Sequence, residues 1–180
     1  IGVGTGTDTD TDTGGSTTTY DSVTLGFETS AEVNGEWDFG DGVVTQTAHE
    51  GSNVLKFEHP STAESWAGVT IAIGHGATDY IADRGVDPTN GSSVTMRVWT
   101  ENDSTVTLDM EDSDNRNTDG SAGRLISSQS EQLTAGQWHD VTFTYPVSAA
   151  SGTEAGTTYN QVVLRTEAGN TVYVDEIAMA

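Results

Sequence analysis

The chain has 180 residues, of which 33% are hydrophobic, and its 28 acidic residues outnumber its 6 basic residues to give a formal net charge of −22. This charge disfavours nucleic acid, anionic membranes and strongly polyanionic glycans as partners. Cysteine is absent, so no disulfide holds the fold. No apolar run approaches the roughly 20 residues of a membrane span. We expect one monomeric domain with a tail, secreted or at a cell surface, where salt screens the acidic charge.

Residues 1–19 predict a disordered linker, because Gly, Thr and Asp alternate there without a pattern that forms a core. The run Asp8, Asp10 and Asp12 is similar to the start of a calcium loop. It lacks the glycine at the sixth loop position and the glutamate at the twelfth. We therefore expect residues 20–180 to fold as one module, which the linker joins to another part of a longer protein.

Short β-strands are predicted throughout residues 20–180, since glycine, serine and threonine are plentiful, apolar and polar residues alternate, and no amphipathic helix is evident. In chain order, we expect strands within residues 20–28, 36–48 (around a turn at Asp41-Gly42), 53–58, 65–73, 94–99, 106–111, 124–129, 141–145, 160–165 and 171–177. About ten short strands joined by turns predict an all-β fold, an antiparallel β-sandwich of the jelly-roll type.

The clearest of these strands is SWAGVTIAI at residues 65–73. Val69, Ile71 and Ile73 alternate to form a core face, and Trp66 lies on the opposite face beside three small residues. An aromatic ring beside cleared space on a sheet face is typical of a platform for a flat ligand.

The non-core faces of this and other strands carry the kinds of side chain that bind sugars. Aromatic rings cover the apolar faces of pyranose rings, while Arg, Asp, Glu and Gln bond the hydroxyl groups. Neighbouring strands lie about 4.8 Å apart, which is comparable to one sugar unit. If these strands are neighbours, one shared face would bind carbohydrate through Trp66, Arg97, Trp99, Asp109, Glu111, Gln161 and Arg165.

The other roles open to these residues are structural. Trp37, beside a turn, and Trp138, at a strand entrance, are predicted to pack against the fold. Arg97 and Arg165 could instead form surface ion pairs with Asp109 and Glu111, and such pairs contribute little to stability.

An enzymatic alternative rests on Glu36-Trp37-Asp38-Phe39-Gly40-Asp41. This segment is similar to the E-x-D-x-x-E signature of retaining β-glucanases with a jelly-roll fold, in which two carboxyl groups lie about 5–5.5 Å apart. That resemblance implies Glu36 as nucleophile, Asp38 as an assisting acid and Asp41 as the acid/base. Asp41 is shorter than the glutamate of the signature, and the segment runs into a turn, so we favour a non-catalytic module.

Short motifs along residues 20–180 resemble the jelly-roll carbohydrate-binding modules appended to laminarinases and other polysaccharide-degrading enzymes, often of marine bacteria. The matching segments are Gly26-Phe27-Glu28, Gly51-Ser52-Asn53, Trp66-Ala67-Gly68, Gln137-Trp138-His139 and Val174-Asp175-Glu176-Ile177. This resemblance implies a β-sandwich that binds a neutral polysaccharide, with a laminarin-like β-1,3-glucan favoured, beside a catalytic domain in the same chain.

The same resemblance implies a structural calcium ion (Ca²⁺) that ties the first strand to the last. Glu28 and Asp175 match its carboxylate ligands, and the segment ending at Asn53 would complete the site. Calcium takes six to eight oxygen ligands, which two carboxylates, carbonyl oxygens and water supply. Glu28 and Asp175 could also be ordinary strand-end acids. A further alternative for the whole chain is a calcium-stiffened spacer or adhesion domain in which Trp66 and Trp99 are buried.

Overall fold

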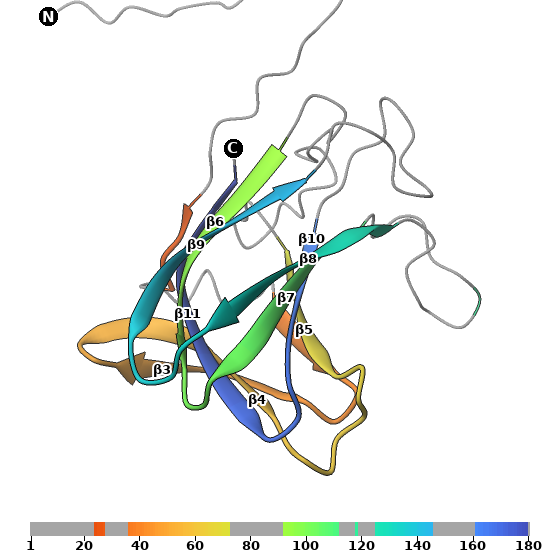
Figure 1. The fold of residues 1–180 in the computed structure, drawn as a ribbon, viewed down its shortest axis with the longest axis horizontal. Helices are drawn as coiled ribbons and strands as arrows, with labels where there is room; N and C mark the ends of the chain where they lie inside the picture. Colours follow the sequence, from red (N-terminus) through yellow and green to blue (C-terminus); the bar gives the residue numbers. More distant parts are fainter. Residues whose placement is uncertain are drawn as a thin grey trace, which may run out of the picture.

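A computed structural model describes residues 24–27, 36–72, 92–111, 118, 125–145 and 161–179, which form an all-β sandwich (Figure 1). The strands are β1 (Thr24–Leu25), β2 (Glu36–Phe39), β3 (Val43–His49), β4 (Ser52–His59), β5 (Gly68–Ala72), β6 (Ser92–Thr100), β7 (Ser104–Glu111), β8 (Leu125–Leu133), β9 (Trp138–Tyr145), β10 (Gln161–Thr166) and β11 (Asn170–Met179). The predicted fold class is confirmed. Within these ranges, no helix has the length and apolar character needed to cross a membrane.

The strands form two antiparallel sheets. The first sheet has the order β3-β4-β11-β6-β9, with β1 paired to β11, and the second has the order β2-β5-β10-β7-β8. Strands that follow each other in the sequence often lie in different sheets, as β2 and β3 do. The chain therefore crosses repeatedly between the layers, as in a jelly roll.

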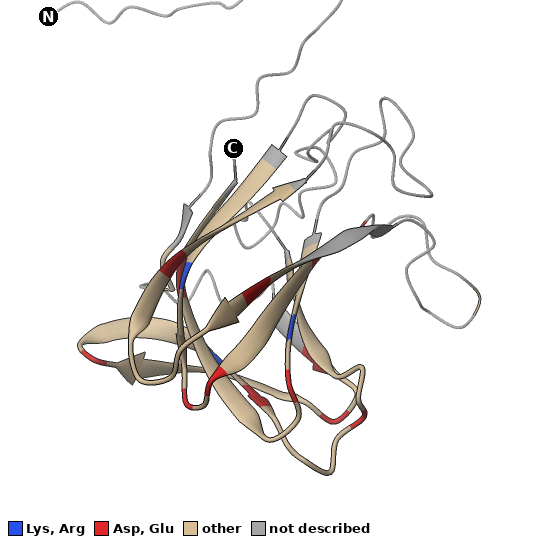
Figure 2. Ribbon diagram, in the orientation of Figure 1, with Lys and Arg blue, Asp and Glu red and all other residues tan. Residues whose placement is uncertain are grey.

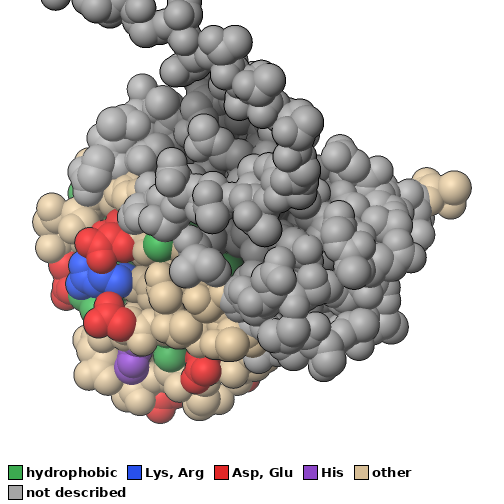
Figure 3. Space-filling view, turned by 90° about the horizontal axis from the view of Figure 1, so that it is seen from above, with side chains coloured by type: hydrophobic (Ala, Val, Ile, Leu, Met, Phe, Trp, Pro, Cys, Tyr) green, Lys and Arg blue, Asp and Glu red, His purple; other side chains and the backbone are tan. Residues whose placement is uncertain are grey.

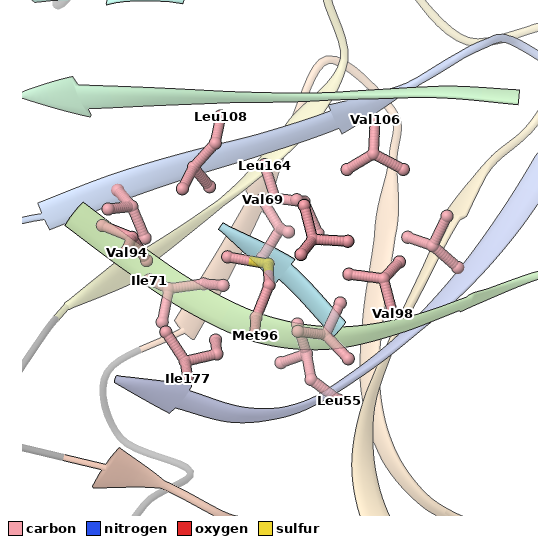
Figure 4. Packing of buried hydrophobic residues seen from close by; sticks show 14 of the residues in the cluster. Leu55, Val69, Ile71, Val94, Met96, Val98, Val106, Leu108, Leu164 and Ile177 are labelled. Carbon is pink, nitrogen blue, oxygen red and sulfur yellow. The ribbon is translucent and has the colours of Figure 1, made fainter. Parts of the chain in front are cut away.

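The core lies between the two sheets and confirms the alternation predicted from the sequence. Val94, Met96 and Val98 of β6 are buried in the first sheet, and they face buried residues of the second sheet such as Val69 and Leu164 (Figure 4). Complete burial of a side chain of this size stabilises the fold by roughly 1.5–3 kcal/mol. The opposite faces of these strands are therefore the ones available for other roles.

Trp66 does not belong to a strand, which corrects the prediction for residues 65–73. The amide of Ala63 donates to the carbonyl of Pro60 at 3.0 Å, and the amide of Ala67 donates to the carbonyl of Glu64 at 2.8 Å. These two turns occupy the stretch before β5, so extended structure begins only at Gly68. Trp66 therefore projects from a turn at the edge of the second sheet.

The predicted turn at Asp41-Gly42 is present, but it joins strands of different sheets. Gly40 and Asp41 have φ angles of 67° and 64°, a region that glycine enters freely and aspartate tolerates. The amide of Gly42 donates to the carbonyl of Phe39 at 3.3 Å. The turn thus directs the chain from β2 in the second sheet to β3 in the first.

Acidic residues occur on turns and strands across the described part of the molecule, whereas basic residues are few (Figure 2). On one face, basic side-chain atoms lie between acidic ones (Figure 3). Because basic residues are so few, the arginines with defined positions are important candidates for a binding site.

Candidate functional site

The seven predicted binding residues divide between the two sheets. Trp66, Asp109, Glu111, Gln161 and Arg165 lie on or beside strands of the second sheet, while Arg97 and Trp99 lie on β6 of the first. The prediction of one shared face is therefore wrong. Alternation places a residue on one side of its own strand, but it does not determine which strands pair, and β6 pairs with β9 and β11.

Flat groups follow one another at the edge of the second sheet. The ring of Trp66 stacks on that of Phe39, with centroids 6.1 Å apart and planes 12° apart. The guanidinium carbon of Arg165 lies 5.8 Å from the centroid of Phe39. Trp66 is 55% exposed, so this stacking platform (Trp66, Phe39 and Arg165) has an open aromatic end.

Two glycines make the close approach of these groups possible. A Cβ on Gly68 would lie 2.7 Å from Cζ of Phe39 and 3.0 Å from Cγ of Arg165. A Cβ on Gly40 would lie 3.0 Å from Cζ3 of Trp66. Phe39 and Gly68 are also partners in the register of β2 and β5. Gly68, two residues after Trp66, thus makes room for the platform.

Phe39 is a platform residue that the sequence analysis missed. Its acidic neighbours dominate the local sequence pattern, and only the pairing of β2 with β5 brings it under Trp66. An alternating aromatic at the end of a strand was the one available signal.

Behind the platform, Arg165 forms an ion pair with Asp109, from Nη1 to Oδ2. The side chain of Asp109 is fully buried and that of Arg165 is partly exposed, so this is not the surface pair considered above. Among the described residues, Asp109 Oδ1 and Arg165 Nε have no hydrogen-bond partner. One hydroxyl group can donate to such a carboxylate oxygen and accept from such an N–H group.

Glu111 and Gln161 lie further along the same sheet, where they are partners in the register of β7 and β10. Glu111 is buried, and the side chain of Gln161 lies outside the described part of the structure. The structure thus groups Trp66, Arg165 and Asp109 closely, with Glu111 and Gln161 on adjoining positions.

Trp99 belongs to an aromatic cluster (His49, Trp99, Trp138 and Tyr173) on the first sheet. His49 stacks on Tyr173 with centroids 3.9 Å apart, and Trp99 meets His49 edge-on at 4.7 Å. All four side chains are partly buried. The cluster connects β3, β6, β9 and β11, so these rings, including Trp138 as predicted, pack against one another.

Arg97 lies against this cluster. Its guanidinium carbon is 4.8 Å from the ring centroid of Trp138, and its Nε is 3.8 Å from Oδ1 of Asp140. Both contacts hold the side chain on the first sheet, away from the stacking platform.

Tyr173 in the same cluster donates a hydrogen bond of 3.1 Å to Oε1 of Glu101. Burial, and then the hydrogen bond and negative charge of Glu101, raise the pKa of the Tyr173 hydroxyl above its ordinary value.

Among the metal ligands predicted, Asp175 and Asn53 lie on paired strands, and Glu28 lies outside the described residues. Val174 is opposite Leu55 in the register of β11 and β4, so Asp175 and Asn53 lie beyond that pair, toward the same end of the two strands. Asp175 is buried, and its Oδ1 accepts the amide of Glu176 at 2.8 Å. Within the part of the chain described, no cluster of three or more His, Asp and Glu side chains is present.

Two acidic residues of the glucanase-like segment, Asp38 and Asp41, contribute to the turn between β2 and β3. Oδ2 of Asp38 accepts the amide of Val44 at 2.8 Å, and Asp41 is exposed in the turn itself. The side chain of Glu36 lies outside the described part. The spacing of Asp38 and Asp41 therefore has a structural explanation in the connection of β2 to β3.

The sequence matches no protein-family model and no curated protein, but the fold matches solved carbohydrate-binding modules. The CBM22-1 xylan-binding domain from Paenibacillus barcinonensis gives a TM-score of 0.54 at 16% identity, over 89% of this chain and 94% of that domain. The family 11 module from Clostridium thermocellum, in complex with a β-1,3-1,4-mixed-linked tetrasaccharide, gives 0.53 at 10% identity, over 90% and 96%.

A larger protein contains the same fold as one part. The CBM22-1 and GH10 modules of the Clostridium thermocellum endo-1,4-β-D-xylanase, complexed with xylohexaose, match with a TM-score of 0.56 at 16% identity. The match covers 89% of this chain and 28% of that one. Although nothing here singles out the modules of laminarinases, this chain has the jelly-roll β-sandwich fold of carbohydrate-binding modules.

Proposed function

We propose that this chain is a non-catalytic carbohydrate-binding module that holds a neutral polysaccharide on the outer face of its second sheet. The observation that carries the proposal is the stacking platform, in which the exposed ring of Trp66 continues into Phe39 and the guanidinium of Arg165. The open face of Trp66 suits the flat, apolar face of a sugar ring. Arg165, whose side chain is 30% exposed, supplies N–H donors for the hydroxyls at the inner end of the platform, and the buried Asp109 holds it in place.

The binding residues are then Trp66, Phe39, Arg165 and Asp109, with Glu111 and Gln161 on adjoining positions of the same sheet. Arg97 and Trp99 lie on the other sheet and are not part of this proposed surface. Strand pairing separates Arg97 and Trp99 from the other predicted residues. The same pairing adds Phe39 to the residues predicted from the sequence.

The ligand that we propose is a β-linked neutral glycan, and a laminarin-like β-1,3-glucan is the first to test. The net charge of −22 opposes polyanionic chains. The structural neighbours support the class, since one is a xylan-binding domain and another was solved with a mixed-linked glucan fragment. The xylanase neighbour joins its module to a catalytic one, which supports an attached polysaccharide-degrading enzyme, outside the cell or on its surface.

A titration of the purified chain with laminarin, xylan, mixed-linkage glucan, agarose and alginate tests the proposal, with tryptophan fluorescence as the signal. We expect a saturable shift with at least one neutral β-glycan and none with alginate, which is polyanionic. The absence of a shift with every glycan would remove the proposed function.

We also propose a structural calcium ion bound by Glu28, Asp175 and the segment of Asn53. The buried carboxylate of Asp175 next to the start of β4 supports it. A bound ion would fix the ends of the first and last strands without contact to the stacking platform.

A further inference from the structure

His59, at the end of β4, is 2% exposed, and both of its ring nitrogens lie against backbone carbonyl oxygens. Nδ1 is 2.7 Å from the oxygen of Thr166, and Nε2 is 3.0 Å from the oxygen of Glu64. A carbonyl oxygen only accepts hydrogen bonds, and a neutral imidazole has a single N–H group. The imidazolium form, with two N–H groups, is therefore the only one that donates to both oxygens.

These two carbonyls belong to the segments that carry the two ends of the stacking platform. Thr166 directly follows Arg165, and Glu64 lies two residues before Trp66. The carbonyl of Glu64 also accepts the amide of Ala67 at 2.8 Å, so it is part of the turn that presents Trp66. The amide of Glu64 donates to the carbonyl of Gly40 at 3.0 Å, under the ring of Trp66. His59 thus bridges the turn of Trp66 to the end of β10.

The groups closest to His59 from the neighbouring strands are uncharged. Asn170 of β11 is its partner in the strand register. Asn170 Nδ2 donates to Oγ1 of Thr166 at 2.9 Å, and Oγ of Ser104 lies 2.9 Å from the same oxygen. The ring of Phe57 lies 6.4 Å from that of His59. These contacts fix Thr166 and leave its carbonyl directed to His59.

The acids on the surrounding segments are on the surface. Glu58 of β4 is bonded to Lys56 at 3.0 Å, and Glu64 and Glu167 are exposed, as is Asp41 of the β2–β3 turn. The two carbonyl oxygens therefore provide the direct polar contacts of the imidazole in this part of the chain.

We propose that His59 is a positioning residue for glycan binding, whose imidazolium form locks the Trp66 turn to the end of β10. This inference rests on the proposed function of the stacking platform. Loss of the proton removes one of the two N–H donors. His59 then donates to the carbonyl of Glu64 or to that of Thr166, but not to both, and it no longer joins the Trp66 turn to the end of β10. Binding is thus strongest where His59 is protonated and weakens as the pH rises. A lost hydrogen bond from a charged donor corresponds to an affinity change of about tenfold.

The free protein gives a test that needs no ligand. Nitrogen-15 NMR of the imidazole, recorded over a range of pH, should show His59 with both nitrogens protonated at the acidic end. The indole N–H signal of Trp66, assigned with Trp66→Phe, should shift with the same midpoint. A single neutral tautomer of His59 throughout, or an indole signal that does not follow it, would overturn the inference.

Binding gives the second test. Laminarin affinity, or that of whichever panel glycan binds, is measured over the same pH range for the wild type, His59→Gln and His139→Gln. His139, on β9 with Nε2 near the carbonyl of Thr134, is the matched control. We expect about tenfold weaker binding at the alkaline end for the wild type and His139→Gln, since one donor is lost. His59→Gln should show a flat profile.

The outcomes separate the two proposals. A flat wild-type profile, or an unchanged profile in His59→Gln, contradicts the role of His59 while leaving glycan binding intact. If no glycan binds at any pH, the proposed function fails, and the NMR of the free wild type still decides the state of His59. The same NMR decides the matter if His59→Gln does not fold by circular dichroism.

Discussion

At the scale of single residues, the site depends on one buried carboxylate and its arginine. Asp109 is 0% exposed and bonded to Arg165 Nη1. An isolated charge is costly to bury, whereas a paired one is tolerated. The pair holds the partly exposed guanidinium of Arg165 in the platform, so Asp109 contributes both to stability and to the position of a binding group.

Removal of Arg165 should therefore destabilise the fold as well as weaken binding. Arg165→Ala leaves Asp109 buried without its partner, which costs about 3–5 kcal/mol. The free energy of unfolding in urea checks this. The double variant Arg165→Ala, Asp109→Ala should recover much of the loss, and a single variant as stable as the wild type would contradict the burial of Asp109.

Tyr173 predicts a loss of stability in alkaline solution. Its pKa is raised in the folded state by burial and by Glu101, so the folded chain holds the proton more firmly than the unfolded chain. The resulting stability is present below the ordinary tyrosine pKa, about 10, and is lost as the pH rises through the raised value. Thermal unfolding of Tyr173→Phe against the wild type, from neutral pH upward, measures it. The same dependence of the melting temperature on pH in both proteins would contradict the raised pKa of Tyr173.

At the scale of elements, β5 and its neighbours show what the sequence could predict. The alternation of Val69 with Ile71 placed the core face correctly, because burial leaves a local pattern with period two. The same pattern wrongly predicts Trp66 as part of the strand, because two turns precede Gly68. The hydrogen bonds of those turns join residues three apart and leave little trace in apolar spacing.

The pairing of the strands could not be predicted from the sequence. Arg97 and Trp99 share the outward alternation of Asp109 and Arg165, yet β6 lies in the other sheet. Which strands pair depends on connections between distant segments, and no local pattern records it. Phe39 was missed for the same reason, since its neighbours Gly68 and Arg165 come from β5 and β10.

Substitution of Gly68 tests whether the platform needs the space that this glycine leaves. In Gly68→Ala the new Cβ meets Cζ of Phe39 at 2.7 Å and the carbonyl oxygen of Leu164 at 2.9 Å. Crowding of this kind costs about 1–3 kcal/mol, and it should move Phe39 away from Arg165 and weaken glycan binding. Urea unfolding and the glycan titration measure both effects.

A compensating change provides the control. Phe39→Leu in the Gly68→Ala background should recover part of the stability, because the ring is one of the two groups that clash. Full stability and binding in Gly68→Ala alone would show that the platform does not need this space.

At the scale of the whole molecule, two sheets with different outer faces share one core. The second sheet carries the stacking platform, and the first carries the packed aromatic cluster. The resemblance found in short motifs led to the correct fold, because turns and core residues at matching places are enough to indicate a jelly roll. The binding face needed the three-dimensional pairing.

Chelation tests the proposed calcium ion. A ligand that binds only the native state raises its stability, so EDTA should lower the melting temperature, and added calcium should restore it. Asp175→Asn should melt near the chelated wild type and respond little to EDTA. A wild-type melting curve that EDTA leaves unchanged would remove Glu28, Asn53 and Asp175 as ligands.

The loss of binding in Trp66→Ala tests the central claim most directly. Calorimetric titration with the glycan that binds the wild type should show affinity lower by at least about thirtyfold, as for a central aromatic contact, with only a small fall in the melting temperature because the ring is 55% exposed. Val43→Ala, the matched control at another exposed apolar side chain (41%), should bind as the wild type does. Wild-type affinity in Trp66→Ala would contradict glycan binding on this platform.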